Sequence, residues 1–196
     1  MLNERLARTQ VLSRYEGSPS ILDFGAVRGT STSLIRQNDT AFKKAEAATA
    51  NGGTIVFPVG DYPNDFSFTL TTGMTYAAAG AGAVRLLYYG AWTQWDLPAT
   101  GLADHVVIRD MTVQGLGANY QGAIRVGRTS QAFDDALLRQ SWVLENLVFQ
   151  GMTSPPPVGS IGISATEYIG WTVRNVTLNN FEQPDLWYRG GGPSSF

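Results

Sequence analysis

The sequence predicts an all-β fold, a short parallel β-helix in which strands stack coil upon coil, with one helix near the amino terminus. Two observations predict this class: a short segment occurs three times in the second half of the chain, and a helix pattern followed by a strand occurs in the first half. The three copies of the segment are Ile108–Gly115, Leu144–Gly151 and Val173–Asn180. Their unequal spacing is typical of a solenoid whose repeating unit is interrupted by loops of different length.

Residues 1–20 are interpreted as an amino-terminal arm, separate from a β-helix domain that spans residues 21–196. A modest helical stripe of apolar residues runs among charged ones, and it consists of Leu2, Leu6, Val11 and Leu12. An isolated helix of this length is marginal in water, so we expect the arm to become ordered against a partner. The alternative is a frayed terminus. The arm also lacks the apolar core of a secretion signal.

The next expected element is a helix over about residues 38–50. Asn38 or Asp39 is suited to cap its amino terminus, and Asn51–Gly53 accepts the left-handed backbone at which helices end. One face of this helix is apolar and consists of Ala41, Phe42, Ala45 and Ala48. A strand over Thr54–Tyr62 follows directly.

Within the repeated segment, apolar and polar residues alternate, which indicates a strand with one buried face. Asp110, Asn146 and Asn175 interrupt the alternation, and we interpret them as a bend because Asp and Asn tolerate left-handed backbone. We expect the three side chains to stack in adjacent coils and to exchange hydrogen bonds. Arg109, Glu145 and Arg174 would form an outward column of alternating charge, which we interpret as a solvated surface stack. A second strand follows each unit, at Ala123–Val126, Ile161–Ser164 and Leu186–Arg189.

Composition restricts the possible partners. The net charge of −2 gives no indication of binding to nucleic acid or to an anionic membrane, and the absence of cysteine excludes disulfides and thiolate metal sites. The most apolar window, Tyr76–Trp92, contains Arg85 and does not have the pattern of a membrane span. Charged residues are 15% of the chain and aromatic residues 11%. Low charge with many aromatics indicates surface that is buried against other chains, so we expect an oligomer.

Three segments together carry a family resemblance: Leu22–Val27, Asn38–Ala45 and Gly52–Tyr62. They resemble the opening of the pectate-lyase superfamily, and most closely that of tailed-phage tailspikes and related virion proteins. The resemblance covers about residues 21–181 and implies a right-handed β-helix whose amino-terminal end is plugged by the helix. It says little about activity, because this fold hosts lyases, hydrolases, epimerases and inert spikes.

Candidate acids for sugar cleavage are numerous but do not form an evident pair. They are Asp96, Asp104, Asp134, Asp135, Glu145, Glu167, Glu182 and Asp185. We therefore assign no catalytic residue, no metal and no cofactor, and keep Asp134, Asp135 and Glu167 as the acids of an enzymatic alternative. His105, beside Asp104, is interpreted as a structural hydrogen-bonding residue.

The aromatic cluster Tyr88, Tyr89, Trp92 and Trp95 is the strongest candidate for binding. Aromatic faces stack on sugar rings or bury large areas against neighbouring subunits, and we favour the subunit interface.

The resemblance implies a virion protein of a tailed bacteriophage on the outer surface of the particle. The small size of the chain, the missing catalytic constellation and the distinct arm favour a non-enzymatic, structural protein. It would be a homotrimeric projection, either a capsid decoration or cement protein or a short spike, which its arm anchors to major capsid or tail proteins. The alternative is a tailspike-like protein that binds or cleaves host surface polysaccharide. A third possibility is that a partner chain carries the chemistry. Neither nucleic acid nor membrane is expected as a partner.

Overall fold

The computed structural model describes residues 15, 17–49, 52–79, 83–90, 93–96, 103–117, 122–126, 141–151, 161–165, 171–179 and 183–188. This part of the chain is mostly β, with one α-helix and two parallel sheets. The eight-stranded sheet contains β1 (Gly53–Phe57), β2 (Gly60–Asn64), β4 (Met74–Ala78), β5 (Val84–Tyr88), β7 (Val106–Arg109), β8 (Thr112–Gly115), β10 (Trp142–Gln150) and β12 (Trp171–Asn179). The five-stranded sheet contains β3 (Phe68–Thr69), β6 (Thr93–Asp96), β9 (Gly122–Val126), β11 (Ile161–Ala165) and β13 (Gln183–Tyr188).

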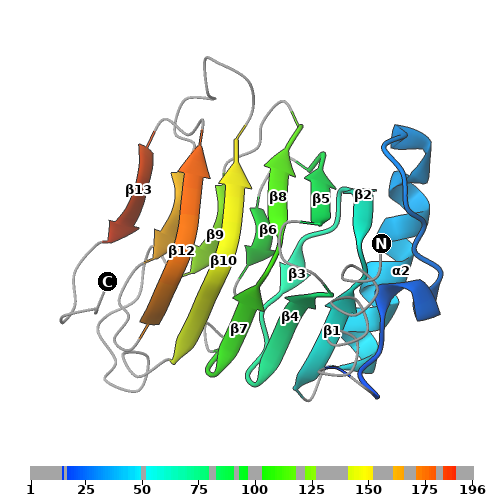
Figure 1. The fold of residues 1–196 in the computed structure, drawn as a ribbon, viewed down its shortest axis with the longest axis horizontal. Helices are drawn as coiled ribbons and strands as arrows, with labels where there is room; N and C mark the ends of the chain where they lie inside the picture. Colours follow the sequence, from blue (N-terminus) through cyan, green and yellow to red (C-terminus); the bar gives the residue numbers. More distant parts are fainter. Residues whose placement is uncertain are drawn as a thin grey trace, which may run out of the picture.

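The strands recur in layers. We define five layers by their strands: β1–β3, β4–β6, β7–β9, β10–β11 and β12–β13. Strands in corresponding positions of successive layers pair in parallel, as β1 with β4 and β4 with β7 do. The long strands β10 and β12 each span two of these positions, because β10 pairs with both β7 and β8. Residues far apart in sequence are thereby superposed, and Figure 1 shows the strands side by side with α2 at the β1–β2 end.

Two short 3-10 helices precede the α-helix, η1 (Ile21–Phe24) and η2 (Thr32–Leu34), and α2 spans Ile35–Ala48. The expected capping by Asn38 or Asp39 is not observed, because η2, capped by Ser31, continues directly into α2. Asn38 instead lies buried inside the helix, where its Oδ1 accepts the Val27 N–H at 2.7 Å and its Nδ2 donates to the Pro63 carbonyl at 2.9 Å.

The buried face of α2 agrees with the sequence pattern except at its last turn. Ala41, Phe42 and Ala45 are buried as predicted. Ala48 is exposed, and Thr49 is the next buried residue.

The expected single strand over Thr54–Tyr62 is two strands, β1 and β2. Pro58, which has no N–H to donate to a sheet, lies between them, and Gly60 has a φ of 147°, which favours glycine. The strands predicted around residues 123–126, 161–164 and 186–189 are confirmed as β9, β11 and β13.

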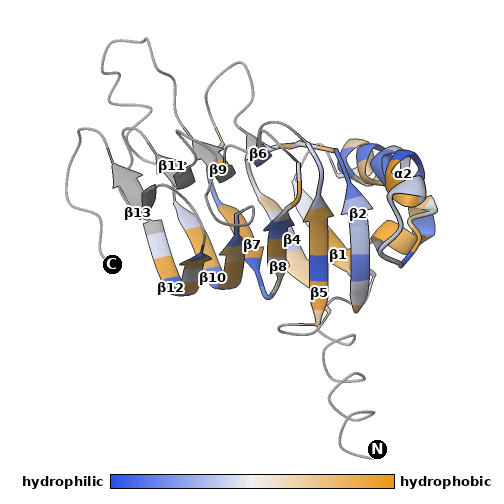
Figure 2. Cartoon of the chain, turned by 90° about the horizontal axis from the view of Figure 1, so that it is seen from above, coloured by the Kyte–Doolittle hydropathy of each residue, from blue (hydrophilic) through white to orange (hydrophobic). Residues whose placement is uncertain are grey.

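The core lies between the two sheets and is closed at one end by α2. Figure 2 shows the five-stranded sheet opposite the eight-stranded sheet, with the helix across the end. Phe68 of β3 stacks on Phe42 of α2 at 5.4 Å between ring centroids and on Trp95 of β6 at 6.1 Å. Trp95 in turn meets Phe149 of β10 edge to face at 6.4 Å. This aromatic column (Phe42, Phe68, Trp95 and Phe149) connects the helix to the fourth layer.

Candidate functional site

The predicted bend residues form a column at equivalent places in three layers. Asp110, Asn146 and Asn175 have φ values of 66°, 53° and 50°, in the left-handed region. The Nδ2 of Asn146 donates to Asp110 Oδ1 at 2.8 Å, and the Nδ2 of Asn175 donates to Asn146 Oδ1 at 3.0 Å. Both the left-handed bend and the hydrogen bonds between layers are therefore confirmed. We call these three residues the bend column.

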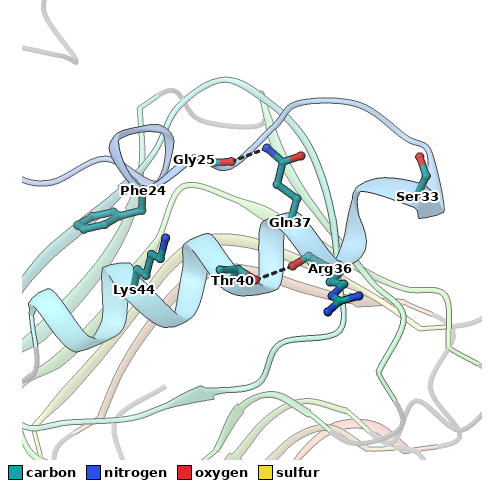
Figure 3. Close-up of a pocket in the computed structure, with 7 residues that line it drawn as sticks. All are labelled: Phe24, Gly25, Ser33, Arg36, Gln37, Thr40 and Lys44. Atoms are coloured by element: carbon teal, nitrogen blue, oxygen red, sulfur yellow. Dashed lines mark hydrogen bonds between the residues drawn. The ribbon is translucent and has the colours of Figure 1, made fainter.

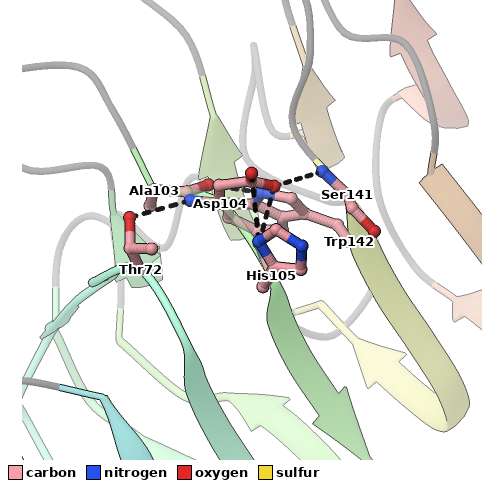
Figure 4. Close-up of polar contacts among 6 residues, drawn as sticks. All are labelled: Thr72, Ala103, Asp104, His105, Ser141 and Trp142. Carbon is pink, nitrogen blue, oxygen red and sulfur yellow. Dashed lines mark hydrogen bonds and ion pairs between the residues drawn. The ribbon is translucent and has the colours of Figure 1, made fainter.

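Asp104 connects the segments that lead into β4, β7 and β10 (Figure 4). Its N–H donates to Thr72 Oγ1 at 3.1 Å, and its Oδ1 accepts the backbone N–H groups of His105 at 2.7 Å and of Ser141 at 2.6 Å. The Nδ1 of His105 lies 3.0 Å from Asp104 Oδ2, while 71% of the His105 side chain is exposed. The contact expected between His105 and Asp104 is present, and Asp104 itself holds three layers together.

The charged column has the predicted register, because Glu145 lies opposite Arg109 on one side and Arg174 on the other. Arg174 approaches Glu145 at 4.0 Å. Arg109 instead places its Nε 3.1 Å from Asp110 Oδ2, and its guanidinium lies 5.6 Å from the centroid of the Tyr15 ring. Only 20% of the Arg109 side chain is exposed, so this end of the column is covered.

The described end of the arm lies against the outer face of the eight-stranded sheet. The Val56 N–H donates to the Pro19 carbonyl at 3.0 Å. Val56, Ala77 and Arg109 are in register on that face, and Val56 and Ala77 are buried. The arm therefore contacts both ends of this three-residue row, at Val56 and at Arg109. The candidate anchoring residues Leu2, Leu6, Val11 and Leu12 lie outside the described residues.

The aromatic cluster has to be corrected for two of its four residues. Trp95 is fully buried and Tyr88 is 2% exposed, so both pack the core of this chain and do not offer an outer surface. Tyr88 lies on the same inward face of β5 as Val84 and Leu86, which are four and two residues before it. The alternation of a strand that starts at Val84 would have predicted this. Tyr89 is half-buried, Trp92 lies outside the described residues, and an interface role for these two stays a prediction.

The candidate acids divide into two groups. Asp104 and Glu145 make the contacts between layers given above. The others lie outside what the structure describes, either wholly or for their side chains: Asp96, Asp134, Asp135, Glu167, Glu182 and Asp185. Within the described residues, no group of three His, Cys, Asp or Glu side chains is placed to hold a metal ion. The described helices include none with the length and apolar character needed to cross a bilayer.

An open groove lies on the outer side of α2, a feature for which the sequence pattern gave no prediction. Its volume is about 550 Å³, and it is lined by Phe24, Gly25, Ser33, Arg36, Gln37, Thr40 and Lys44 (Figure 3). Gln37 Nε2 donates to the Gly25 carbonyl at 3.0 Å, which fixes η1 beside the helix. Arg36, Thr40 and Lys44 follow one another at intervals of four residues and therefore share one face. We call this feature the helix groove.

Both carboxylates of α2 lie on the side away from the helix groove. Asp39 Oδ1 accepts the Asp65 N–H at 2.8 Å, and Glu46 Oε1 accepts the Thr69 N–H, so both carboxylates face the strand side. Burial raises the pKa of Asp39 and that of Glu46. Arg36 and Lys44 line the helix groove, and Lys43 is exposed outside it.

No family model, no curated protein and no solved structure matches this chain.

Proposed function

We propose that the chain is a structural protein of a tailed-phage virion. It would be a short right-handed β-helix, closed at its amino-terminal end by α2, that projects as a homotrimer from the capsid or tail. The proposal rests on the family resemblance for its virion context and its trimeric state, and on the layered strands for its architecture. The arm would attach the projection to major capsid or tail proteins.

One observation carries the structural role: polar side chains connect every successive pair of described layers. Arg85 of β5 forms a two-point ion pair with Asp61 of β2, which connects the first and second layers. Asp104 connects the second, third and fourth layers, and the bend column connects the third, fourth and fifth. Polar groups used in this way stiffen a stack along its length, which is what a projection needs.

The arm supports the same proposal, because its described end is fixed on the sheet. Tyr15 lies over Arg109, and the Pro19 carbonyl accepts the Val56 N–H. The described end of the arm is thus fixed on the sheet, so the proposed attachment would start from a defined place on the projection.

Electron microscopy of intact particles, with antibody labelling of this chain, tests the location directly. We expect label at the outer surface of the capsid or tail, and analytical ultracentrifugation should give the mass of three chains. Absence of label from particles, or a monomer at micromolar concentration, would contradict the proposal. An experimental structure with left-handed connections would contradict the fold assignment.

The enzymatic alternative has its own assay. Purified protein is incubated with host surface polysaccharide, and reducing ends or ultraviolet-absorbing elimination products are measured. We expect no products. Cleavage that is abolished by Asp135→Asn or Glu167→Gln would replace the structural proposal with a polysaccharide-cleaving tailspike.

A further inference from the structure

We propose that the helix groove binds an acidic, extended peptide segment of the capsid or tail protein to which this chain would attach. The identity of that partner rests on the proposed function, whereas the acidic character of the peptide follows from the residues that line the groove. The groove lies at the end of the stack that α2 closes, and Arg36 and Lys44 are two of its seven lining residues.

The charge of the groove differs from that of the chain. The whole chain carries a formal net charge of −2, yet the lining of the groove holds two cations and, among its seven residues, no carboxylate. The helix carboxylates, on Asp39 and Glu46, accept backbone N–H groups on the other side. Asp23 directly precedes the lining residue Phe24 in the chain, and its carboxylate accepts the Ser20 N–H at 2.8 Å. The cations of the groove therefore face solvent with no described carboxylate bonded to them.

The spacing of the cations suits an extended peptide. Arg36 and Lys44 are eight residues apart on a helix, which is about 12 Å at the usual rise. An extended chain covers that distance in about four residues. Two carboxylates separated by three residues would thus meet both cations. Thr40, whose hydroxyl donates to the Arg36 carbonyl at 2.8 Å, lies between the cations, and Phe24 and Ser33 lie at the two ends of the groove.

The same lining argues against a sugar as the occupant. Sugar hydroxyls donate as well as accept, and carboxylates are the strongest acceptors that side chains offer. None of the seven lining residues has a carboxylate, and the Gly25 carbonyl already accepts a hydrogen bond from Gln37. The chemistry favours a ligand that brings the negative charge itself.

The test measures binding of a fluorescent ten-residue oligoglutamate peptide to the full chain by anisotropy at low salt. We expect Arg36→Ala and Lys44→Ala each to weaken binding about threefold to fivefold, and the double variant about tenfold or more. Lys43→Ala is the matched control: it removes the same charge from the neighbouring exposed residue, which does not line the groove. Its effect should stay below about twofold.

Three outcomes would overturn the inference. They are no binding by the unchanged protein, equal losses in all single variants including Lys43→Ala, and tighter binding of oligogalacturonate than of oligoglutamate. Circular dichroism of each variant checks that the exposed substitutions leave the fold intact. Particle labelling is a separate readout. If the chain is found on virions but its groove does not bind the peptide, the proposed function stands and the groove inference is wrong.

Discussion

Four residues other than glycine have left-handed backbone in the described part of the chain: His105, Asp110, Asn146 and Asn175. Left-handed backbone costs an L-residue about 1–2 kcal/mol, and Asn and Asp less than most. In the bend column this cost is offset by the amide bonds between layers, each contributing about 0.5–1.5 kcal/mol. The column was predictable because Asp and Asn interrupt a clear alternation. His105 carried no such signal, since its conformation depends on the bonds that Asp104 makes to the segments before β7 and β10.

Substitution of Asn146 separates the two contributions. Asn146→Gly keeps the left-handed backbone and removes the side chain that both donates to Asp110 and accepts from Asn175. Asn146→Ala removes the side chain and also adds strain. We expect Asn146→Gly to lower the free energy of unfolding by about 1–2 kcal/mol and Asn146→Ala by about 1 kcal/mol more. Urea denaturation measures both, and equal losses would show that the backbone conformation contributes nothing.

Gly117 tests how closely successive layers approach where the chain leaves β8 and β5. A Cβ at this position would clash with the backbone oxygens of Tyr89 and Gly90, the two residues that directly follow β5. We expect Gly117→Ala to lower the free energy of unfolding by about 3 kcal/mol. Gly17→Ala is the comparison, because Gly17 has a φ of 84° and open space around its Cβ position, so this variant reports backbone strain without a clash and its loss should stay near 1 kcal/mol. Similar losses at the two sites would contradict the close approach.

At the scale of elements, α2 shows what local sequence pattern can and cannot give. The apolar series Ala41, Phe42 and Ala45 predicted the helix and its buried face, because that face follows directly from helical spacing. The start at Ile35 was not predicted, because it depends on η2 continuing into the helix. The role of Asn38 was not predicted either, because it donates to the Pro63 carbonyl of β2. The helix groove also escaped prediction, because it requires η1 to lie beside α2.

Glu46 gives α2 a pH dependence whose sign follows from its burial. Burial raises its native pKa above the ordinary value of 4.5, although the Thr69 N–H acts in the opposite direction. The native state therefore holds this proton more tightly than the unfolded chain, and stability falls as pH rises from 4.5 through the native pKa. Glu46→Gln removes the titration. We expect the stability of the variant relative to the unchanged protein to increase between pH 4 and pH 7, measured by urea denaturation at each pH. A pH-independent difference would contradict the shift.

At the scale of the whole molecule, residues that pack the layers were harder to assign than the layers themselves. The repeated segments predicted which strands superpose, because segments with the same pattern of apolar and polar residues occupy the same position in successive layers. Whether Tyr88 and Trp95 face inward depends on where β5 and β6 begin, and the aromatic cluster on its own gave no indication of that. Tyr15 lies far from Arg109 in sequence, so no local pattern could predict that the arm covers this part of the sheet.

Two truncations separate the proposed anchoring role of the arm from its contact with the sheet. Removal of residues 1–14 keeps Tyr15 over Arg109, and we expect a fully stable trimer that no longer sediments with particles. Removal of residues 1–16 should also lose attachment, and in addition lower the free energy of unfolding by about 1 kcal/mol, because the contact between cation and ring is lost. Thermal denaturation and co-sedimentation measure the two effects. Attachment that survives the shorter truncation would place the anchor elsewhere.

The aromatic column gives the molecule a built-in optical reporter. The indole of Trp95 lies against Phe68, which in turn stacks on Phe42, so its surroundings change if the helix leaves the end of the stack. An indole shielded from solvent emits at shorter wavelength than a hydrated one. Trp95 is one of five tryptophans, so release of the helix should change its share of the intrinsic emission of the unlabelled protein.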